Sequence, residues 1–100
     1  MQGLRVHITG IVQGVGFRPF VYNLATRLDL KGWVRNTSAG VDIEVDGEKE
    51  ILDSFVKLLR DEAPPLSLID EFTASFQPPS GFGSFEILHS EAVEGAFQPI

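Results

Sequence analysis

The stretch "LRVHITGIVQGVGFRPFVYNLATRL", residues 4–28, changes its hydrophobic period at a glycine-rich bend. Before the bend, in residues 4–9, apolar and polar residues alternate, as in a strand with one buried face. After the bend, Phe20, Leu24 and Leu28 follow the i, i+4 spacing of an amphipathic helix. This segment therefore predicts a strand that turns directly into a helix.

The rest of the chain repeats this alternation of patterns. Strands are expected at 32–38 and 41–47, a helix at 48–63, and further strands at 66–76 and 85–88. The order is β-α-β-β-α-β with one short additional strand. This order predicts an α+β protein with the split βαβ, or ferredoxin-like, fold, in which two helices cover one face of an antiparallel sheet and the extra C-terminal strand lies at an edge.

Small residues and acids suggest where the helices begin and end. We expect the first helix to stop at Gly32 and the second to be capped by Asp46 or Gly47.

Composition limits the class of protein. The chain of 100 residues is long enough for one domain and has no cysteine, so neither disulfides nor thiolate metal sites are available. Its start lacks the pattern of a signal peptide, and no segment is as long and apolar as a membrane span. We therefore expect a cytoplasmic protein.

Charge is distributed unevenly along the chain. The net charge is −6, which disfavours nucleic acid and membranes as partners. Residues 1–40 nevertheless carry a net +4, whereas residues 41–100 carry −10. A local site for a small anion is compatible with this distribution, but an extended basic surface is not.

The bend at residues 10–18 has the features of an anion site. Glycines at a strand-to-helix turn allow successive N–H groups to converge, and a helix start adds partial positive charge. Arg18 follows Gly14 and Gly16 and can grip two oxygens of a phosphate. The bend is neither a Walker A loop nor a dinucleotide fingerprint. The alternative is an ordinary turn with a solvated arginine.

Asn36 is a second candidate for this site. In a split βαβ fold the first and third strands are neighbours, and the hairpin brings the second strand beside the third. Asn36, near the end of its strand, can then approach the bend. The alternative role is a turn-forming asparagine. His7 and His89 are isolated in the sequence, so we expect no metal and no cofactor.

The motifs "GIVQGVGFR" (10–18) and "VRN" (34–36) resemble those of the acylphosphatase family, and the resemblance covers residues 4–90. It implies a ferredoxin-like fold and hydrolysis of acyl phosphates without a cofactor. It assigns phosphate binding to Arg18 with the backbone amides of the loop and positioning of the attacking water to Asn36. The implied amides are those of Gly14, Val15, Gly16, Phe17 and Arg18.

Further segments resemble one branch, the acylphosphatase-like N-terminal domains of the HypF carbamoyltransferases: "FRPFVYNLA" (17–25), "APPLSLID" (63–70) and "FEILHS" (85–90). This implies a domain at 1–90 and a linker at 91–100 that leads to a downstream region. It also implies carbamoyl phosphate as substrate, a role in [NiFe]-hydrogenase maturation, and the downstream domains and the protein HypE as partners. Two alternatives stay open: a free-standing acylphosphatase of broad range, and a non-catalytic anion-binding module.

Overall fold

The computed structural model describes residues 1–88, so His89 and the linker expected at 91–100 lie outside the described residues. In chain order the elements are β1 (Gln2–Ile11), α1 (Phe17–Arg27), β2 (Lys31–Asn36), β3 (Gly40–Gly47), α2 (Lys49–Asp61), β4 (Leu68–Gln77) and β5 (Phe85–Ile87).

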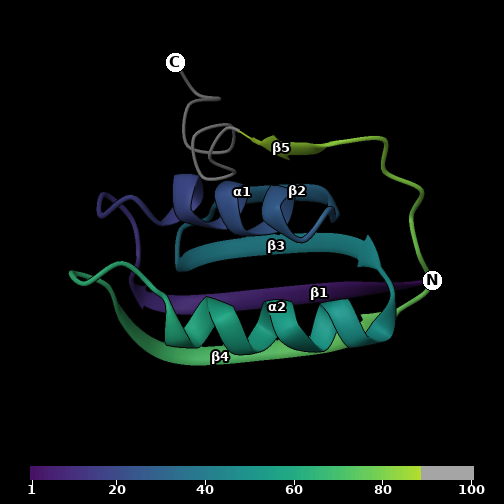
Figure 1. Cartoon of the computed structure of the whole chain (residues 1–100). Coiled ribbons are helices and arrows are strands. Elements are labelled where there is room, and N and C mark those ends of the chain that lie inside the picture. The colour runs from purple at the N-terminus through teal and green to yellow at the C-terminus, as the bar shows by residue number, and fades with distance from the viewer. Residues whose placement is uncertain (89–100) are drawn as a thin grey trace, which may run out of the picture.

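The strands form one sheet in the order β4-β1-β3-β2-β5, with both helices on the same face (Figure 1). The four long strands pair antiparallel, which confirms the predicted split βαβ arrangement. The short strand β5 lies at the edge, as expected, and it runs parallel to β2, a direction that hydrophobic periodicity does not set.

The core fills the space between the helices and the sheet. Strand residues Leu4, Val6 and Ile8, predicted from their alternation, are each at most 1% exposed. The helices contribute apolar residues of one face to the same cluster: Phe17, Val21, Leu24, Ala25, Leu52, Phe55 and Leu59. Within residues 1–88, neither helix is long and apolar enough to cross a membrane.

The end of α1 differs from the expectation. The helix ends at Arg27, and Asp29 takes the left-handed conformation with φ 60°. The N–H groups of Asp29 and Leu30 return to carbonyls of the last helical turn at 3.1 and 2.8 Å. The prediction that Gly32 stops the helix is wrong, because aspartate tolerates this conformation and closes the helix earlier.

Asp46 has a different role from the one predicted. Neither Asp46 nor Gly47 caps α2, whose N-cap residue is Glu48. The Asp46 carboxylate is buried and accepts the backbone N–H groups of Ser80, at 3.0 Å, and of Gly81, at 2.7 Å. The carboxylate thus holds the β4–β5 connection, which lets the chain return to the β2 edge.

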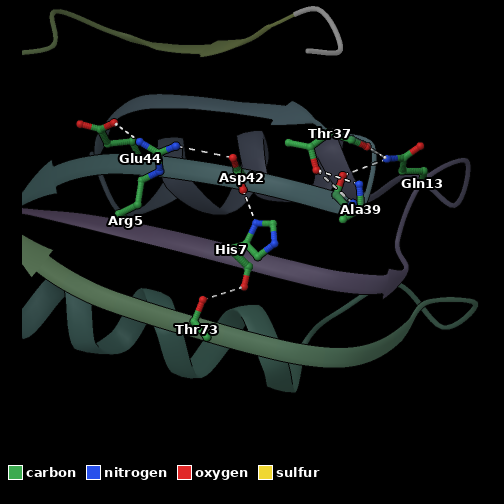
Figure 2. A network of polar contacts seen from close by, with 9 residues as sticks. Arg5, His7, Gln13, Thr37, Ala39, Asp42, Glu44 and Thr73 are labelled. Carbon is green, nitrogen blue, oxygen red and sulfur yellow. Dashed lines mark hydrogen bonds and ion pairs between the residues drawn. The ribbon is translucent and has the colours of Figure 1, made fainter. Parts of the chain in front are cut away.

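The sheet face without helices is polar (Figure 2). Arg5 on β1 lies between two acids of β3, at 3.5 Å from Asp42 and 3.3 Å from Glu44, and His7 contacts Asp42. Such part-exposed ion pairs stabilise a fold only slightly, but they make a solvent-facing sheet surface soluble. Among the described residues, no group of three His, Asp or Glu side chains is arranged to hold a metal ion.

Candidate active site

The loop between β1 and α1 is shaped by two glycines in the left-handed region. Gly14 has φ 75° and Gly16 has φ 84°, conformations that other residues rarely adopt. A Cβ at either position would meet no atom within 4 Å. Glycine is therefore favoured there by its backbone conformation and not by lack of space, and the loop stays open on that side. Left-handed residues within a turn direct successive N–H groups to one side, which forms a concave nest for an anion.

The start of α1 extends this nest. Gly16 is the N-cap residue and makes no side-chain capping bond, and no acidic residue lies in the first helical turn. The first N–H groups of a helix, here those of Phe17 and Arg18, have no acceptor within the helix. Together with the helix dipole, they give this end of α1 a positive potential.

Arg18 is held in place by the end of the described chain. Its side chain is half-buried, and Nη1 donates to the carbonyl oxygen of Leu88 at 3.3 Å. Leu88 in turn donates its N–H to the carbonyl of Val34 at 2.8 Å, which continues the β5–β2 pairing. A guanidinium has five N–H donors, so this bond restrains the orientation of Arg18 and leaves donors for an anion.

Asn36 contributes an unusual acceptor. It is the last residue of β2 and pairs with Val41 across the hairpin. Its Oδ1 atom is buried and receives no hydrogen bond from residues 1–88. An unsatisfied buried polar atom costs about 1–3 kcal/mol, so an O–H or N–H donor from a ligand would relieve this cost.

A pocket of about 230 Å³ is formed where the loop, the helix start and the end of β2 meet. Its lining consists of Val12, Gly14, Gly16, Phe17, Arg18, Pro19 and Asn36. The structure therefore brings Arg18 and Asn36 together with the predicted loop. Val15 does not line the pocket and packs its side chain against the core, so only its predicted backbone N–H could reach a phosphate, and that role stays a prediction.

A larger hollow of about 470 Å³ lies elsewhere, beside Met1, Leu30 and Phe82. Its lining includes neither Gly14 and Gly16 nor Arg18, which line the smaller pocket.

Two contacts at the site were missed by sequence reasoning. One is the Leu88 carbonyl on Arg18, which depends on where β5 pairs. The other is Gln13, whose side-chain amide donates to the carbonyls of Thr37 and Gly40. Gln13 lies inside the glycine-rich motif, but an exposed polar residue in a loop gives no periodic signal.

Fold and pocket together define a small α+β protein with a pocket at a strand-to-helix loop, lined by Arg18 and Asn36. The acylphosphatase family model matches residues 4–87, and the chain belongs to the acylphosphatase family. It is 47% identical over 93 residues to the carbamoyltransferase HypF2 of Cupriavidus necator, covering 89% of this chain and 12% of that protein. It is 41% identical to the acylphosphatase of Dehalococcoides mccartyi, covering 87% of this chain and 98% of that protein.

Two solved structures represent the same two groups. A full-length HypF in a phosphate- and nucleotide-bound form is similar with a TM-score of 0.85 at 40% identity, over 90% of this chain and 12% of that one. The acylphosphatase from Bacillus subtilis is similar with a TM-score of 0.83 at 33% identity, and the match covers 88% of this chain and 99% of that one. The chain thus spans about one eighth of the length of the carbamoyltransferases it matches and nearly all of the small acylphosphatases.

Proposed function

We propose that this chain hydrolyses acyl phosphates in the pocket between the β1–α1 loop and the end of β2, with Arg18 and Asn36 as catalytic residues. Membership of the acylphosphatase family supports this activity. The observation that carries the proposal is that one pocket combines the positive loop, the restrained Arg18 and the Oδ1 acceptor of Asn36, which receives no hydrogen bond within residues 1–88.

The loop and Arg18 bind the phosphoryl group. Backbone N–H groups of residues 14–18 and the guanidinium donate hydrogen bonds to its non-bridging oxygens. Phosphoryl transfer spreads negative charge over these oxygens in the transition state, so fixed donors around them lower the barrier. The left-handed glycines orient the loop N–H groups, and the Leu88 carbonyl orients the Arg18 guanidinium, before the substrate binds. Little reorganisation of these donors is therefore needed during the reaction.

Asn36 orients the attacking water. Its Oδ1 accepts one O–H of the water, which directs a lone pair of the water oxygen at phosphorus. The new P–O bond forms as the bond from phosphorus to the acyl oxygen breaks, and that electron pair leaves on a carboxylate. The carboxylate is a good leaving group, so no general acid is required. The proton of the water passes to a phosphoryl oxygen, and the products are the carboxylate and inorganic phosphate.

We propose further that the substrate is carbamoyl phosphate, which would give carbamate and phosphate. On this view the chain acts in the cytoplasm as the N-terminal domain of a HypF-type carbamoyltransferase in hydrogenase maturation, together with its downstream domains and HypE. The support is its identity to proteins named HypF, at 47% and 43% for the first two relatives.

A second candidate is a free-standing acylphosphatase of broad range. It is favoured by the near-complete coverage, 98% and 99%, of two small acylphosphatases by this chain. A marked preference in kcat/KM for carbamoyl phosphate over acetyl phosphate would support the HypF-type role, whereas similar values for both would favour the broad-range enzyme.

The activity is tested by comparing the wild type with Arg18→Ala on both substrates. Loss of a preorganised donor costs about 10²–10³ in rate, and we expect at least this loss because Arg18 supplies several donors. Arg27→Ala is the matched control, since Arg27 lies on the same helix in an exposed ion pair with Glu62, at 3.0 Å.

Three results are informative. Loss of turnover in Arg18→Ala alone supports the proposal. Wild-type turnover in Arg18→Ala would remove Arg18 from the mechanism. A wild-type chain that binds phosphate but turns over neither substrate would be a non-catalytic anion-binding module.

A further inference from the structure

We infer that Gln13 is a positioning residue for Asn36, because its side chain ties the anion-binding loop to the turn that carries Asn36. The inference rests on the proposed function and adds a residue to it. Within residues 1–88, the side chain of Gln13 forms no hydrogen bond with Arg18 or Asn36. Its effect on Asn36 would therefore be transmitted through the turn.

The contacts of Gln13 are specific. Nε2 donates to the carbonyl oxygen of Thr37 and to that of Gly40, the latter at 2.9 Å (Figure 2). An amide NH₂ has two hydrogens, and both are used. Because both partners are carbonyl oxygens, only the nitrogen side of the amide can face the turn. The orientation of the side chain is therefore determined by its acceptors.

The turn that Gln13 holds is closed on itself. Thr37 is only 6% exposed, and its N–H donates to the Gly40 carbonyl at 2.8 Å. The Thr37 hydroxyl oxygen accepts the N–H groups of Ala39, at 3.2 Å, and of Gly40, at 3.1 Å. Residues 37–40 thus form one unit, and Asn36 directly precedes it. A displacement of this unit would displace Asn36 as well.

Sheet pairing does not connect the β1–α1 loop to the turn at 37–40. β1 pairs with β3 as far as Thr9 and Gly40 and with β4 as far as Ile11 and Leu68, and the chain then enters the loop with its two left-handed glycines. Gln13 lies beyond that last pair, between Val12 and Gly14, which both line the pocket. Its side chain therefore spans from the phosphate-binding wall of the pocket to the wall that carries Asn36.

This placement predicts a particular kinetic effect. Arg18 is restrained by the Leu88 carbonyl and the loop by the left-handed conformations of Gly14 and Gly16, so phosphate binding has supports other than the turn, whereas the water must lie in line with the scissile bond. Small misplacements of a reacting group reduce rate strongly, by up to about 10² for 1 Å. Loss of the Gln13 bonds should therefore lower kcat more than it weakens binding of phosphate.

The test uses Gln13→Met, which keeps the length of the side chain and removes both donors. We expect kcat to fall about tenfold, with a smaller change in the Kd of inorganic phosphate. Gln77→Met is the matched control, because Gln77 also donates through Nε2, at 2.8 Å to Glu44 on the open sheet face, away from the pocket. An unchanged kcat in Gln13→Met would overturn the inference.

A double-mutant cycle identifies the route of the effect. If Gln13 acts through Asn36, then Gln13→Met should cause almost no further loss of kcat in an Asn36→Ala background. The same fold-loss in both backgrounds would mean that Gln13 acts independently of Asn36, and the inference would be wrong.

A structural readout separates this inference from the proposed function. We expect Gln13→Met, but not Gln77→Met, to speed hydrogen exchange at the Gly40 amide and to shift the NMR signals of the Asn36 side-chain amide. If the wild type lacks turnover, the proposed function fails. The exchange rate at Gly40 and the Asn36 signals then still test whether Gln13 positions Asn36. Unchanged signals in Gln13→Met would then refute this role.

Discussion

Arg18 and Asn36 present opposite chemistry to the same pocket. Arg18 offers several donors, of which one is used by the Leu88 carbonyl, and Asn36 offers one buried acceptor. An anion is attracted by donors, whereas a water needs an acceptor for one of its hydrogens. Substitution of Arg18 should therefore weaken anion binding, whereas substitution of Asn36 should mainly reduce turnover.

At this scale we predict that Asn36→Ala loses turnover while it still binds inorganic phosphate with near-normal affinity, because a group that acts mainly in the transition state affects kcat more than ground-state binding. The measurements are steady-state kinetics with an acyl phosphate and calorimetric titration with phosphate. Asn23→Ala, an exposed asparagine on α1, is the control. Equal losses of affinity and of turnover in Asn36→Ala would assign Asn36 to ligand binding instead.

At the scale of elements, β5 supports the site despite its three residues. Phe85 is 7% exposed and packs edge-on against the Tyr22 ring of α1, with ring centroids 6.1 Å apart. The strand pairs in parallel with β2 and leads to the Leu88 carbonyl that restrains Arg18. Besides this backbone pairing, Phe85 is the one buried side chain of the strand.

We therefore predict that Phe85→Ala destabilises the fold by about 3 kcal/mol, as large-to-small core substitutions do, and also weakens phosphate binding. Ile87→Ala on the same strand is the control, since Ile87 is 43% exposed, and should cost about 0.5 kcal/mol. Urea unfolding gives both values, and phosphate titration of the folded variants gives the affinities. Phosphate affinity that stays normal in Phe85→Ala would show that β5 does not restrain Arg18.

For the whole molecule, the proposed anion site lies in a chain of net charge −6. Anions in general add little to the stability of an acidic protein, so a specific stabilisation by phosphate can be distinguished from the effect of other salts. A ligand that binds only the native state stabilises it by RT ln(1 + [L]/Kd), about 2.7 kcal/mol at 100-fold excess over Kd.

We predict that phosphate raises Tm saturably, beyond chloride at matched ionic strength, with each 1 kcal/mol worth roughly 4–8 °C for a domain of this size. Arg18→Ala should lose most of the shift. Thermal melts at increasing phosphate provide the measurement. Equal shifts from phosphate and chloride in both proteins would mean that the β1–α1 loop is only a turn.

Much of this architecture can be predicted because it is encoded locally. The alternation at residues 4–9 and the helical spacing from Phe20 to Leu28 each lie within consecutive residues, so element type and the buried face follow from them. The failures concern polar residues. Asp29 closes α1 earlier than Gly32 could, and Asp46 binds the backbone near Ser80 rather than α2.

By itself, the sequence determined the strand–loop–helix unit and the order of elements, and it predicted that Asn36 approaches the loop that carries Arg18, where the structure has both lining one pocket. Only the tertiary structure decided what each polar side chain binds there: Leu88 for Arg18, 70 residues away, and the turn at 37–40 for Gln13. The physical reason is that burial of an apolar face is a sum over many neighbouring residues and tolerates small errors. A hydrogen bond needs one donor and one acceptor within about 3 Å, and for residues far apart in sequence that distance is set by the packing of the whole sheet.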